Sequence, residues 1–323
     1  MNISVFLKAI NQEIENLKYG QEPAQLYDPI DYLMALGGKR IRPLLTVLAS
    51  SMFDTNWQKA LKPAIGVEVF HNFTLMHDDI MDKAPLRRGK ATVHAKWNDN
   101  IAILSGDVML VCAYELMLEV ENQHLRQVIQ RFNKTAAQVC EGQQFDMDFE
   151  QLGHVSASEY LNMIKLKTAV LLGFALELGG IIGGADVNTC GALNEIGNCI
   201  GLGFQIKDDI LDVYGNADKF GKQVGGDIIA NKKTLLLIYA RQQAQGNTKI
   251  ELDKWLNVSN FDAQEKVKAV TDIYNQLNIK AQAENLMNDY FDKAFAHIQN
   301  LNAPTESKAI LHDFATWLID REN

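Results

Sequence analysis

Apolar residues recur at three- and four-residue spacing through most of this 323-residue chain, and strand-like alternation with Asn-Gly or Asp-Gly turns is absent. This spacing places apolar side chains along one face of an α-helix, and only six prolines interrupt the chain. No Ser/Gly linker, low-complexity tract or shift of composition marks a boundary. We therefore predict an all-α fold in a single domain over residues 1–323. The predicted helices span residues 2–18, 26–36, 43–53, 61–81, 99–120, 122–149, 156–180, 186–214, 232–245, 262–279, 281–300 and 305–320.

The charge and the cysteines exclude several classes of protein. A net charge of -9 argues against nucleic acid as a partner, because phosphate backbones are bound by surplus Lys and Arg. The four cysteines lie singly in apolar segments without Cys-x-x-Cys spacing, which favours buried thiols over disulfides or zinc ligands. No apolar run reaches about 18 residues without a charge, and the amphipathic N-terminus resembles neither a signal nor a transit peptide. We expect a cytoplasmic protein with no transmembrane segment.

Three carboxylates within five residues end the predicted helix 61–81, at Asp78, Asp79 and Asp82. Positions i and i+4 of an α-helix point the same way, so Asp78 and Asp82 share a face, with Asp79 beside them. Such charges repel one another and are costly to desolvate, so a cation should compensate them. A solvated helix end explains one such cluster equally well.

A second cluster repeats this spacing at Asp208, Asp209 and Asp212, again at the end of an apolar run. Two acidic clusters of identical spacing, each ending an apolar helix, are hard to explain as surface decoration. Carboxylates with all-oxygen ligation suit Mg²⁺, which keeps several waters and bridges carboxylates to a phosphorylated substrate.

Cationic segments lie near both clusters. Residues 37–43 (Gly-Gly-Lys-Arg-Ile-Arg-Pro) join a helix-ending Gly pair to a helix-starting Pro, so their cations and backbone N–H groups form a candidate phosphate cradle. The loop 83–91 and the segments 219–222 and 231–234 follow the carboxylates directly. Charge neutralisation explains any one of these segments alone. Together with the two acidic clusters, they predict a site for a diphosphate and its metal ions.

The rest of the substrate is expected to be apolar, because Phe70, Phe73, Leu172, Phe174 and Phe204 would line the space between the clusters. No Walker or Rossmann glycine motif and no Ser or Cys triad signature is present. A metal-bound diphosphate is a good leaving group, and its departure would leave a carbocation in a dry pocket.

With these motifs the chain resembles the trans-type polyprenyl (isoprenyl) diphosphate synthases. The resemblance is collinear from Gly37 to about Thr234 and rests on two Asp-Asp-x-x-Asp motifs, Gly-Gly-Lys-Arg-x-Arg and a Lys-Thr pair. It implies one domain of mostly antiparallel helices around a deep central cavity, assembled as a homodimer. It also implies Mg²⁺-dependent head-to-tail condensation of isopentenyl diphosphate with an allylic prenyl diphosphate, giving an all-trans prenyl diphosphate and pyrophosphate, with three Mg²⁺ in each substrate-bound site.

The resemblance also assigns roles to individual residues. Those that match the binding site for isopentenyl diphosphate are Lys39, Arg42, His71 and Arg88. Those that match the Mg²⁺ ligands are Asp78, Asp82, Asp208 and Asp212, and Asp79 and Asp209 complete the catalytic clusters. Those that match the clamp on the allylic diphosphate are Arg87, Lys167, Lys222 and Lys232, and Thr168 and Gln205 match polar neighbours of the cation. Asn231 replaces the Gly usual before Lys232, and Lys233 follows, so which lysine reaches the diphosphate stays open.

The length of the product depends on the helix upstream of the first cluster. Phe73 and Phe70 lie about one and two turns before Asp78, where a bulky ring limits chain growth in similar synthases, and Thr74 in place of a second aromatic indicates a slightly deeper pocket. We expect a geranylgeranyl (C20) product, with farnesyl (C15) next and longer chains as further alternatives. Both rings are equally compatible with an ordinary core.

Two other classes share part of this pattern. A terpene cyclase keeps the first Asp motif but replaces the second by Asn/Asp-x-x-Ser/Thr-x-x-x-Glu. A non-catalytic partner subunit loses metal ligands. Both Asp motifs are intact here, which favours the active prenyltransferase.

Overall fold

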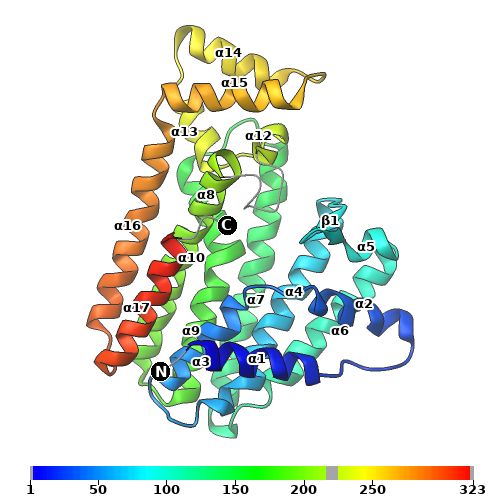
Figure 1. Ribbon diagram of the computed structural model, residues 1–323, viewed down its shortest axis with the longest axis vertical. Helices are drawn as coiled ribbons and strands as arrows, with labels where there is room; N and C mark the ends of the chain where they lie inside the picture. Colours follow the sequence, from blue (N-terminus) through cyan, green and yellow to red (C-terminus); the bar gives the residue numbers. More distant parts are fainter. Residues whose placement is uncertain (1–2, 216–224, 321–323) are drawn as a thin grey trace. The chain divides into compact units, whose positions relative to one another are not determined.

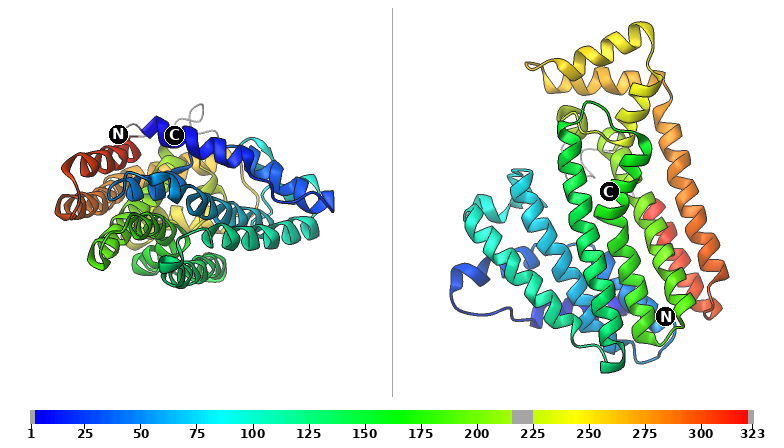
Figure 2. Two further views of the ribbon diagram at one scale, coloured as in Figure 1. Left: turned by 90° about the horizontal axis from the view of Figure 1, so that it is seen from below. Right: turned by 180° about the vertical axis from the view of Figure 1, so that it is seen from behind.

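A computed structural model describes residues 3–215 and 225–320, and these residues form helices connected by short loops (Figures 1 and 2). The predicted all-α class is confirmed. The first helices are α1 (Ile3–Asn16), α2 (Ala24–Ala35), α3 (Ile41–Ser51), the 3₁₀ turn η1 (Trp57–Ala60), α4 (Leu61–Met81), α5 (Val93–Lys96), α6 (Asp99–Met117) and α7 (Asn122–Gln151). The later ones are α8 (Ala157–Ile164), the π-helical turn η2 (Lys165–Ala169), α9 (Val170–Gly183), α10 (Val187–Tyr214), α12 (Gly226–Ile229), α13 (Leu235–Gln243), α14 (Gly246–Asn257), α15 (Ala263–Gln276), α16 (Ile279–Asn300) and α17 (Thr305–Asp320).

Several segments differ from the sequence prediction. The loop 83–91 contains a β-hairpin, β1 (Leu86–Arg87) paired antiparallel with β2 (Lys90–Ala91). Helix α14 is absent from the prediction, because it begins at a glycine with positive φ and carries few apolar residues. The predicted helix 232–245 starts only at Leu235, since Asn231 adopts a left-handed conformation and ends the short α12 before it.

By packing, the described residues divide into two compact units. Unit 1 comprises Met1–Ala136, Leu171–Gly197 and Gln299–Leu311, and unit 2 comprises Ala137–Val170, Asn198–Ile298 and His312–Asn323. Because α7 and α10 contribute residues to both units, the boundary cuts through continuous helices. The single domain over residues 1–323 and its central cavity stay predictions.

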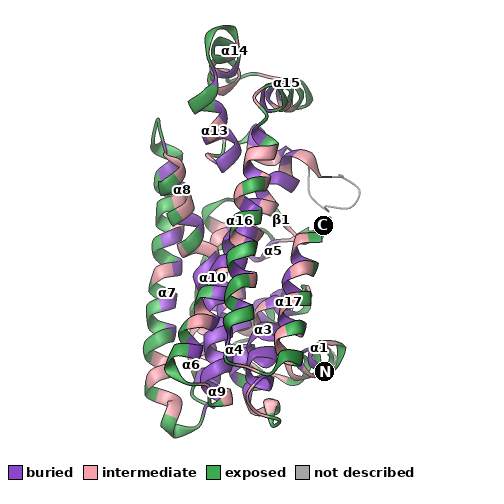
Figure 3. Ribbon diagram, turned by 90° about the vertical axis from the view of Figure 1, so that its left-hand side faces the viewer, coloured by how far each residue is buried: buried purple, intermediate pink, exposed green. Residues whose placement is uncertain are grey.

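The core of unit 1 is built around α9, whose residues from Leu171 to Ile182 are all buried (Figure 3). Glycines let α9 approach α3 at backbone distance: a Cβ on Gly179 would lie 2.2 Å from the carbonyl oxygen of Thr46. Helices α4 and α6 lie side by side in the same unit (Figures 1 and 2). This packing buries most of α4 and leaves its C-terminal end, with the first Asp motif, at the edge of the core.

In unit 2, helices α7 and α10 enclose the π-helical turn η2 at close range. A Cβ on Gly142 of α7 would lie 2.2 Å from the backbone nitrogen of Lys167, and one on Gly201 of α10 would lie 2.5 Å from the Cα of Ala169. A π-turn inside a helix often marks a functional position, because it re-aims the side chains that it carries. Here it carries Lys167 and Thr168, two of the predicted site residues.

Two helical segments are long and apolar enough, by length and composition alone, to cross a membrane. The segment Ala157–Gly183 is 78% buried inside the structure, as expected of a core helix. Helix α6 is only 39% buried and exposes Leu104, Val111 and Leu118 at seven-residue spacing at its surface and just beyond its end. Residues seven apart share a helix face, so these three side chains form one apolar stripe.

Candidate active site

The first Asp motif ends α4, and its middle carboxylate has a partner within the chain. Asp79 is only 3% exposed and accepts two hydrogen bonds of 2.7 Å from the Arg87 guanidinium. Asp78 is partly exposed and Asp82 is exposed. The predicted clamp residue Arg87 therefore holds the motif itself, and the i/i+4 pair faces away from the core.

The β-hairpin that presents Arg87 also brings Arg88 to the Gly-Gly turn. Arg88 and Gly89 both have positive φ, 52° and 73°, as in the two-residue turns that match the twist of a hairpin. Arg88 donates a short hydrogen bond to the carbonyl oxygen of Gly37. A Cβ on Gly38 would lie 3.0 Å from an Arg88 nitrogen, so the absence of a side chain at Gly38 allows Arg88 to lie close to this turn.

Beside Arg88 lie Arg42 and His71, and the burial of these groups shapes their charge. Burial is the main cause that lowers the pKa of Arg42 to about 10. The charge of Glu68 raises this pKa, and the charge of Arg88 lowers it. Burial lowers the pKa of His71 well below its usual value, and the nearby Arg42 and Arg88 add to this. The Nε of Arg42 is buried and has no hydrogen-bond partner among the described residues. Neighbouring cations with a buried donor that has no partner among the described residues fit an anionic ligand.

The remaining cations of the Gly-Gly-Lys-Arg-x-Arg segment point in different directions. Arg40, with a φ of 50°, is 6% exposed and pairs with Glu68 at 2.7 Å, and it also donates to the carbonyl oxygen of Met34. Lys39, one residue earlier, is exposed. Arg40 is thus a structural residue that anchors the turn, whereas Lys39 remains on the surface beside the predicted phosphate site.

The second Asp motif, at the end of α10, has the same internal arrangement. Asp209 is 4% exposed and accepts a short hydrogen bond from the Tyr160 hydroxyl and one of 3.3 Å from the Gln205 amide. The Thr168 hydroxyl donates to the Gln205 carbonyl oxygen at 3.2 Å. Burial raises the pKa of Asp209 well above its usual value, and the charge of Asp227 adds to this. Consecutive hydrogen bonds thus link the predicted residues Thr168, Gln205 and Asp209, and the Tyr160 hydroxyl holds Asp209.

The outer carboxylates of this motif, Asp208 and Asp212, are partly exposed. Asp212 accepts a 2.9 Å hydrogen bond from the backbone N–H of Asp227 at the start of α12. The Asp227 side chain therefore enters the surroundings of the motif, although nothing in its local sequence spacing indicates this.

Some of the predicted lysines bind other groups of the protein, and another is exposed. Lys167 binds Asp146 of α7 at 2.6 Å, so the counter-anion that its apolar surroundings require comes from the chain. Lys233 donates to the carbonyl oxygen of Glu150 at 3.2 Å, whereas Lys232 is exposed. Lys222 lies outside the described residues.

The predicted chain-length floor belongs to an aromatic cluster in unit 1. The Phe70 ring lies 5.6 Å from that of Phe73 and 5.2 Å from that of Phe132, which in turn contacts Phe174 at 5.8 Å. Phe70 is 1% and Phe73 9% exposed. Thr74 donates to the carbonyl oxygen of His71 at 2.8 Å. Phe132 packs against the predicted floor residue Phe70 and was not singled out from the sequence.

The fit to a metal ion rests on the outer carboxylates of each motif. Among residues 3–215 and 225–320, no group of three or more His, Cys, Asp or Glu side chains is placed to hold a metal. Mg²⁺ does not require such a cage, because it is bound through one or two carboxylates together with waters and substrate phosphates. The pairs Asp78/Asp82 and Asp208/Asp212 supply hard oxygen ligands of this kind. Each pair by itself therefore fits a Mg²⁺ ion whose coordination is completed by water and substrate phosphates.

Comparisons with known proteins agree with this arrangement. The polyprenyl synthetase family profile matches residues 23–274. A geranylgeranyl diphosphate synthase of Methanosarcina mazei is 36% identical over 315 residues, 97% of this chain and 95% of that protein. A geranylfarnesyl diphosphate synthase of Natronomonas pharaonis is 33% identical, over 97% of this chain and 94% of its own. A crystal structure of a geranylgeranyl pyrophosphate synthase superposes with a TM-score of 0.95 at 42% identity, covering 100% of both chains. With the motifs, the all-α fold and these likenesses in agreement, the chain belongs to the polyprenyl synthetase family.

Proposed function

We propose that this protein is a Mg²⁺-dependent trans-prenyltransferase that condenses isopentenyl diphosphate with an allylic diphosphate to a short-chain prenyl diphosphate, releasing pyrophosphate. The observation that carries the proposal is the cluster of Arg42, His71 and Arg88. Arg42 is partly buried, its buried Nε has no hydrogen-bond partner among the described residues, and the exposed Arg88 lies beside it. A diphosphate would supply the missing charge and acceptors.

The roles of the residues follow from their contacts. Arg42, His71, Arg88 and the exposed Lys39 would bind the diphosphate of the isopentenyl nucleophile, and His71 would do so as a neutral donor because its pKa is low. Lys167 and Lys232 would bind the allylic diphosphate. Thr168 and Gln205, held in one hydrogen-bonded chain, would turn their oxygens toward the developing cation. Bound Mg²⁺ would neutralise the charge that develops on the leaving diphosphate.

The outer carboxylates Asp78, Asp82, Asp208 and Asp212 are the residues that would hold Mg²⁺. Asp82 is exposed and the other three are partly exposed, whereas the middle Asp of each motif is buried. Asp78→Ala is expected to reduce turnover by orders of magnitude while the protein stays folded. Near-normal activity of that variant would contradict the proposed metal role.

The product is proposed to be the C20 chain. The aromatic cluster around Phe70 and Phe73 supports a closed floor, and the likeness to synthases of geranylgeranyl and geranylfarnesyl diphosphate makes a longer product the main alternative. The experiment incubates the protein with Mg²⁺, labelled isopentenyl diphosphate and C5, C10 or C15 allylic diphosphates, and then measures product length. Lack of elongation with any primer contradicts the prenyltransferase. Cyclised hydrocarbon without elongation would identify a terpene cyclase instead.

The stripe of Leu104, Val111 and Leu118 supports a homodimer. These side chains are 57%, 58% and 54% exposed on an apolar helix, and a second copy would cover them. Val111→Glu is expected to convert the dimer to monomer in sedimentation or light-scattering measurements. A protein that is already monomeric, or a variant that stays dimeric, argues against this surface.

A further inference from the structure

Helix α15 carries a lysine with no solvent exposure. Lys266 is 0% exposed. Its Nζ donates to the Oδ1 of Asn231 at 2.7 Å and to the carbonyl oxygen of Ile229 at 3.3 Å, and it lies 4.2 Å from the centre of the Phe261 ring. Thus the ammonium is held by one amide oxygen, one backbone carbonyl and an aromatic face.

This arrangement is costly for a cation. Burial lowers the pKa of Lys266, and among the described residues no carboxylate forms an ion pair with it. An apolar residue of similar length would avoid this desolvation. The Lys266 side chain therefore contributes more by holding its hydrogen-bond partners than by packing α15.

The main partner, Asn231, has a backbone conformation that few residues adopt. Its φ is 52°, in the left-handed region that Asn and Gly tolerate best. Its side-chain amide donates to the carbonyl oxygen of Leu256 in α14 at 3.1 Å, while its oxygen accepts from Lys266 of α15. A glycine would allow the same φ but would make neither bond. Asn231 thus ties the turn before Lys232 to the hairpin formed by α14 and α15.

The same turn is tied to the second Asp motif at its other end. The backbone N–H of Lys232 donates to the carbonyl oxygen of Asp227 at 2.9 Å, and the N–H of Asp227 donates to the carboxylate of Asp212 at 2.9 Å. Gly225 approaches α15 so closely that a Cβ there would lie 2.6 Å from a Val267 methyl group. Residues 225–232 are therefore held between α15 and Asp212.

We propose that Lys266 is a positioning residue that acts through Asn231 to fix the segment 225–232, and thereby holds Lys232 and Asp212 ready for the allylic diphosphate. This inference rests on the proposed prenyl transfer. The α14–α15 hairpin then contributes to substrate binding without touching the substrate.

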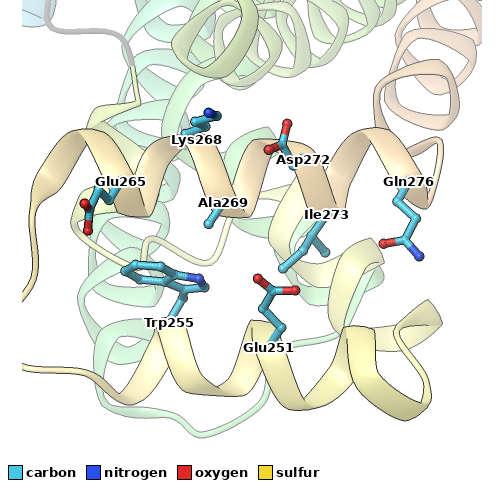
Figure 4. Close-up of a pocket in the computed structure, with 8 residues that line it drawn as sticks. All are labelled: Glu251, Trp255, Glu265, Lys268, Ala269, Asp272, Ile273 and Gln276. Atoms are coloured by element: carbon cyan, nitrogen blue, oxygen red, sulfur yellow. The ribbon is translucent and has the colours of Figure 1, made fainter.

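The test replaces Lys266 by methionine and compares it with Lys268→Met. Lys268 lies two residues later on α15, is exposed and lines the surface groove between α14 and α15 (Figure 4), so both variants lose one positive charge from the same helix. For Lys266→Met we expect faster amide hydrogen exchange in residues 225–234 and a KM for the allylic diphosphate raised about tenfold, as for loss of a hydrogen bond to a charged group. The KM for isopentenyl diphosphate should not change. Lys268→Met should behave as wild type in all three measurements.

Asn231→Gly removes the bond to Lys266 from the other side, together with the bond to Leu256, while keeping the left-handed backbone, and it should reproduce both effects even if Lys266→Met folds poorly. The double variant should then show less than the sum of the two single effects, because the bond that the two variants share can be lost only once. Unchanged exchange and an unchanged KM in both single variants overturn the inference. If the wild-type protein makes no prenyl product, the proposed function fails, and the exchange measurement still decides whether Lys266 fixes the segment.

Discussion

Gly142 of α7 is the position where one added methyl group should most directly disturb the π-helical turn that carries Lys167 and Thr168. Its ideal Cβ would lie 2.2 Å from the backbone nitrogen of Lys167 and 2.7 Å from the Cα of Lys167 and the carbonyl carbon of Leu166. All three are backbone atoms of the π-helical turn, so no flexible side chain can move aside. Gly142→Ala must therefore displace the turn that carries Lys167 and Thr168, or displace α7.

The size of the effect follows from these distances. The 2.2 Å contact falls about 1.2 Å short of the 3.4 Å at which ordinary van der Waals contact begins. A misplacement of about 1 Å at a catalytic group can reduce turnover on the order of 100-fold. Overpacking costs about 1–3 kcal/mol of unfolding free energy, and replacing a helical Gly by Ala returns up to about 1 kcal/mol. We expect a net loss of about 0–2 kcal/mol, so the protein should stay folded while kcat falls on the order of 100-fold.

The assay combines urea unfolding with steady-state prenyl transfer at saturating isopentenyl diphosphate. Gly191→Ala is the matched control, because Gly191 lies in α10, is exposed, and a Cβ there would meet no atom within 4 Å. That variant should keep wild-type turnover and gain stability. The reasoning is refuted if Gly142→Ala retains wild-type kcat, since the turn would then tolerate the shift or not require its position.

Further changes test the other contacts. Tyr160→Phe removes a donor from buried Asp209 and should lower unfolding free energy by about 1–3 kcal/mol together with turnover; unchanged values in urea unfolding and kinetics would show that Tyr160 is dispensable. Asp79→Ala should destabilise the protein by a similar amount because Arg87 loses its partner, whereas Asp78→Ala should not. Thermal unfolding of the two variants measures this difference in stability. Burial lowers the pKa of His71, so as the pH falls the unfolded state binds a proton before the folded state does. The unfolding free energy should therefore be full above about pH 6.5 and decrease below it by up to about 1.4 kcal/mol per pH unit. If a His71→Gln variant shows the same pH dependence, the dependence comes from another group. Phe73→Ala should lengthen the product, and an unaltered product distribution by chromatography would remove this ring from the floor.

Local patterns predicted the helices well because helical periodicity is contained in a few consecutive residues. The helix that bears the first Asp motif spans Leu61–Met81, as its sequence predicts. The segments that were predicted wrongly depend on single backbone conformations. The hairpin at Arg88–Gly89 and the break at Asn231 both require positive φ, which composition alone does not specify for Arg and Asn.

The site was harder to predict where a charge finds its partner far along the chain. Arg40 pairs with Glu68, 28 residues away, and Lys167 with Asp146, 21 residues away. Tyr160 reaches Asp209 across 49 residues. The sequence therefore indicates which residues carry charge, whereas the fold decides which of those charges are satisfied internally and which remain for a ligand.

In both Asp motifs the same carboxylate is bound within the protein, and helix geometry gives the physical reason for the spacing of the motif. Successive helical residues are rotated by about 100°, so the second Asp of each motif cannot share the face of the first and last. In both helices that second carboxylate is buried, and a buried carboxylate needs donors. Arg87 supplies them to Asp79, and Tyr160 with Gln205 supplies them to Asp209. The middle Asp thus anchors the end of its helix, and the outer pair at i and i+4 is the pair that would be left to bind a metal ion.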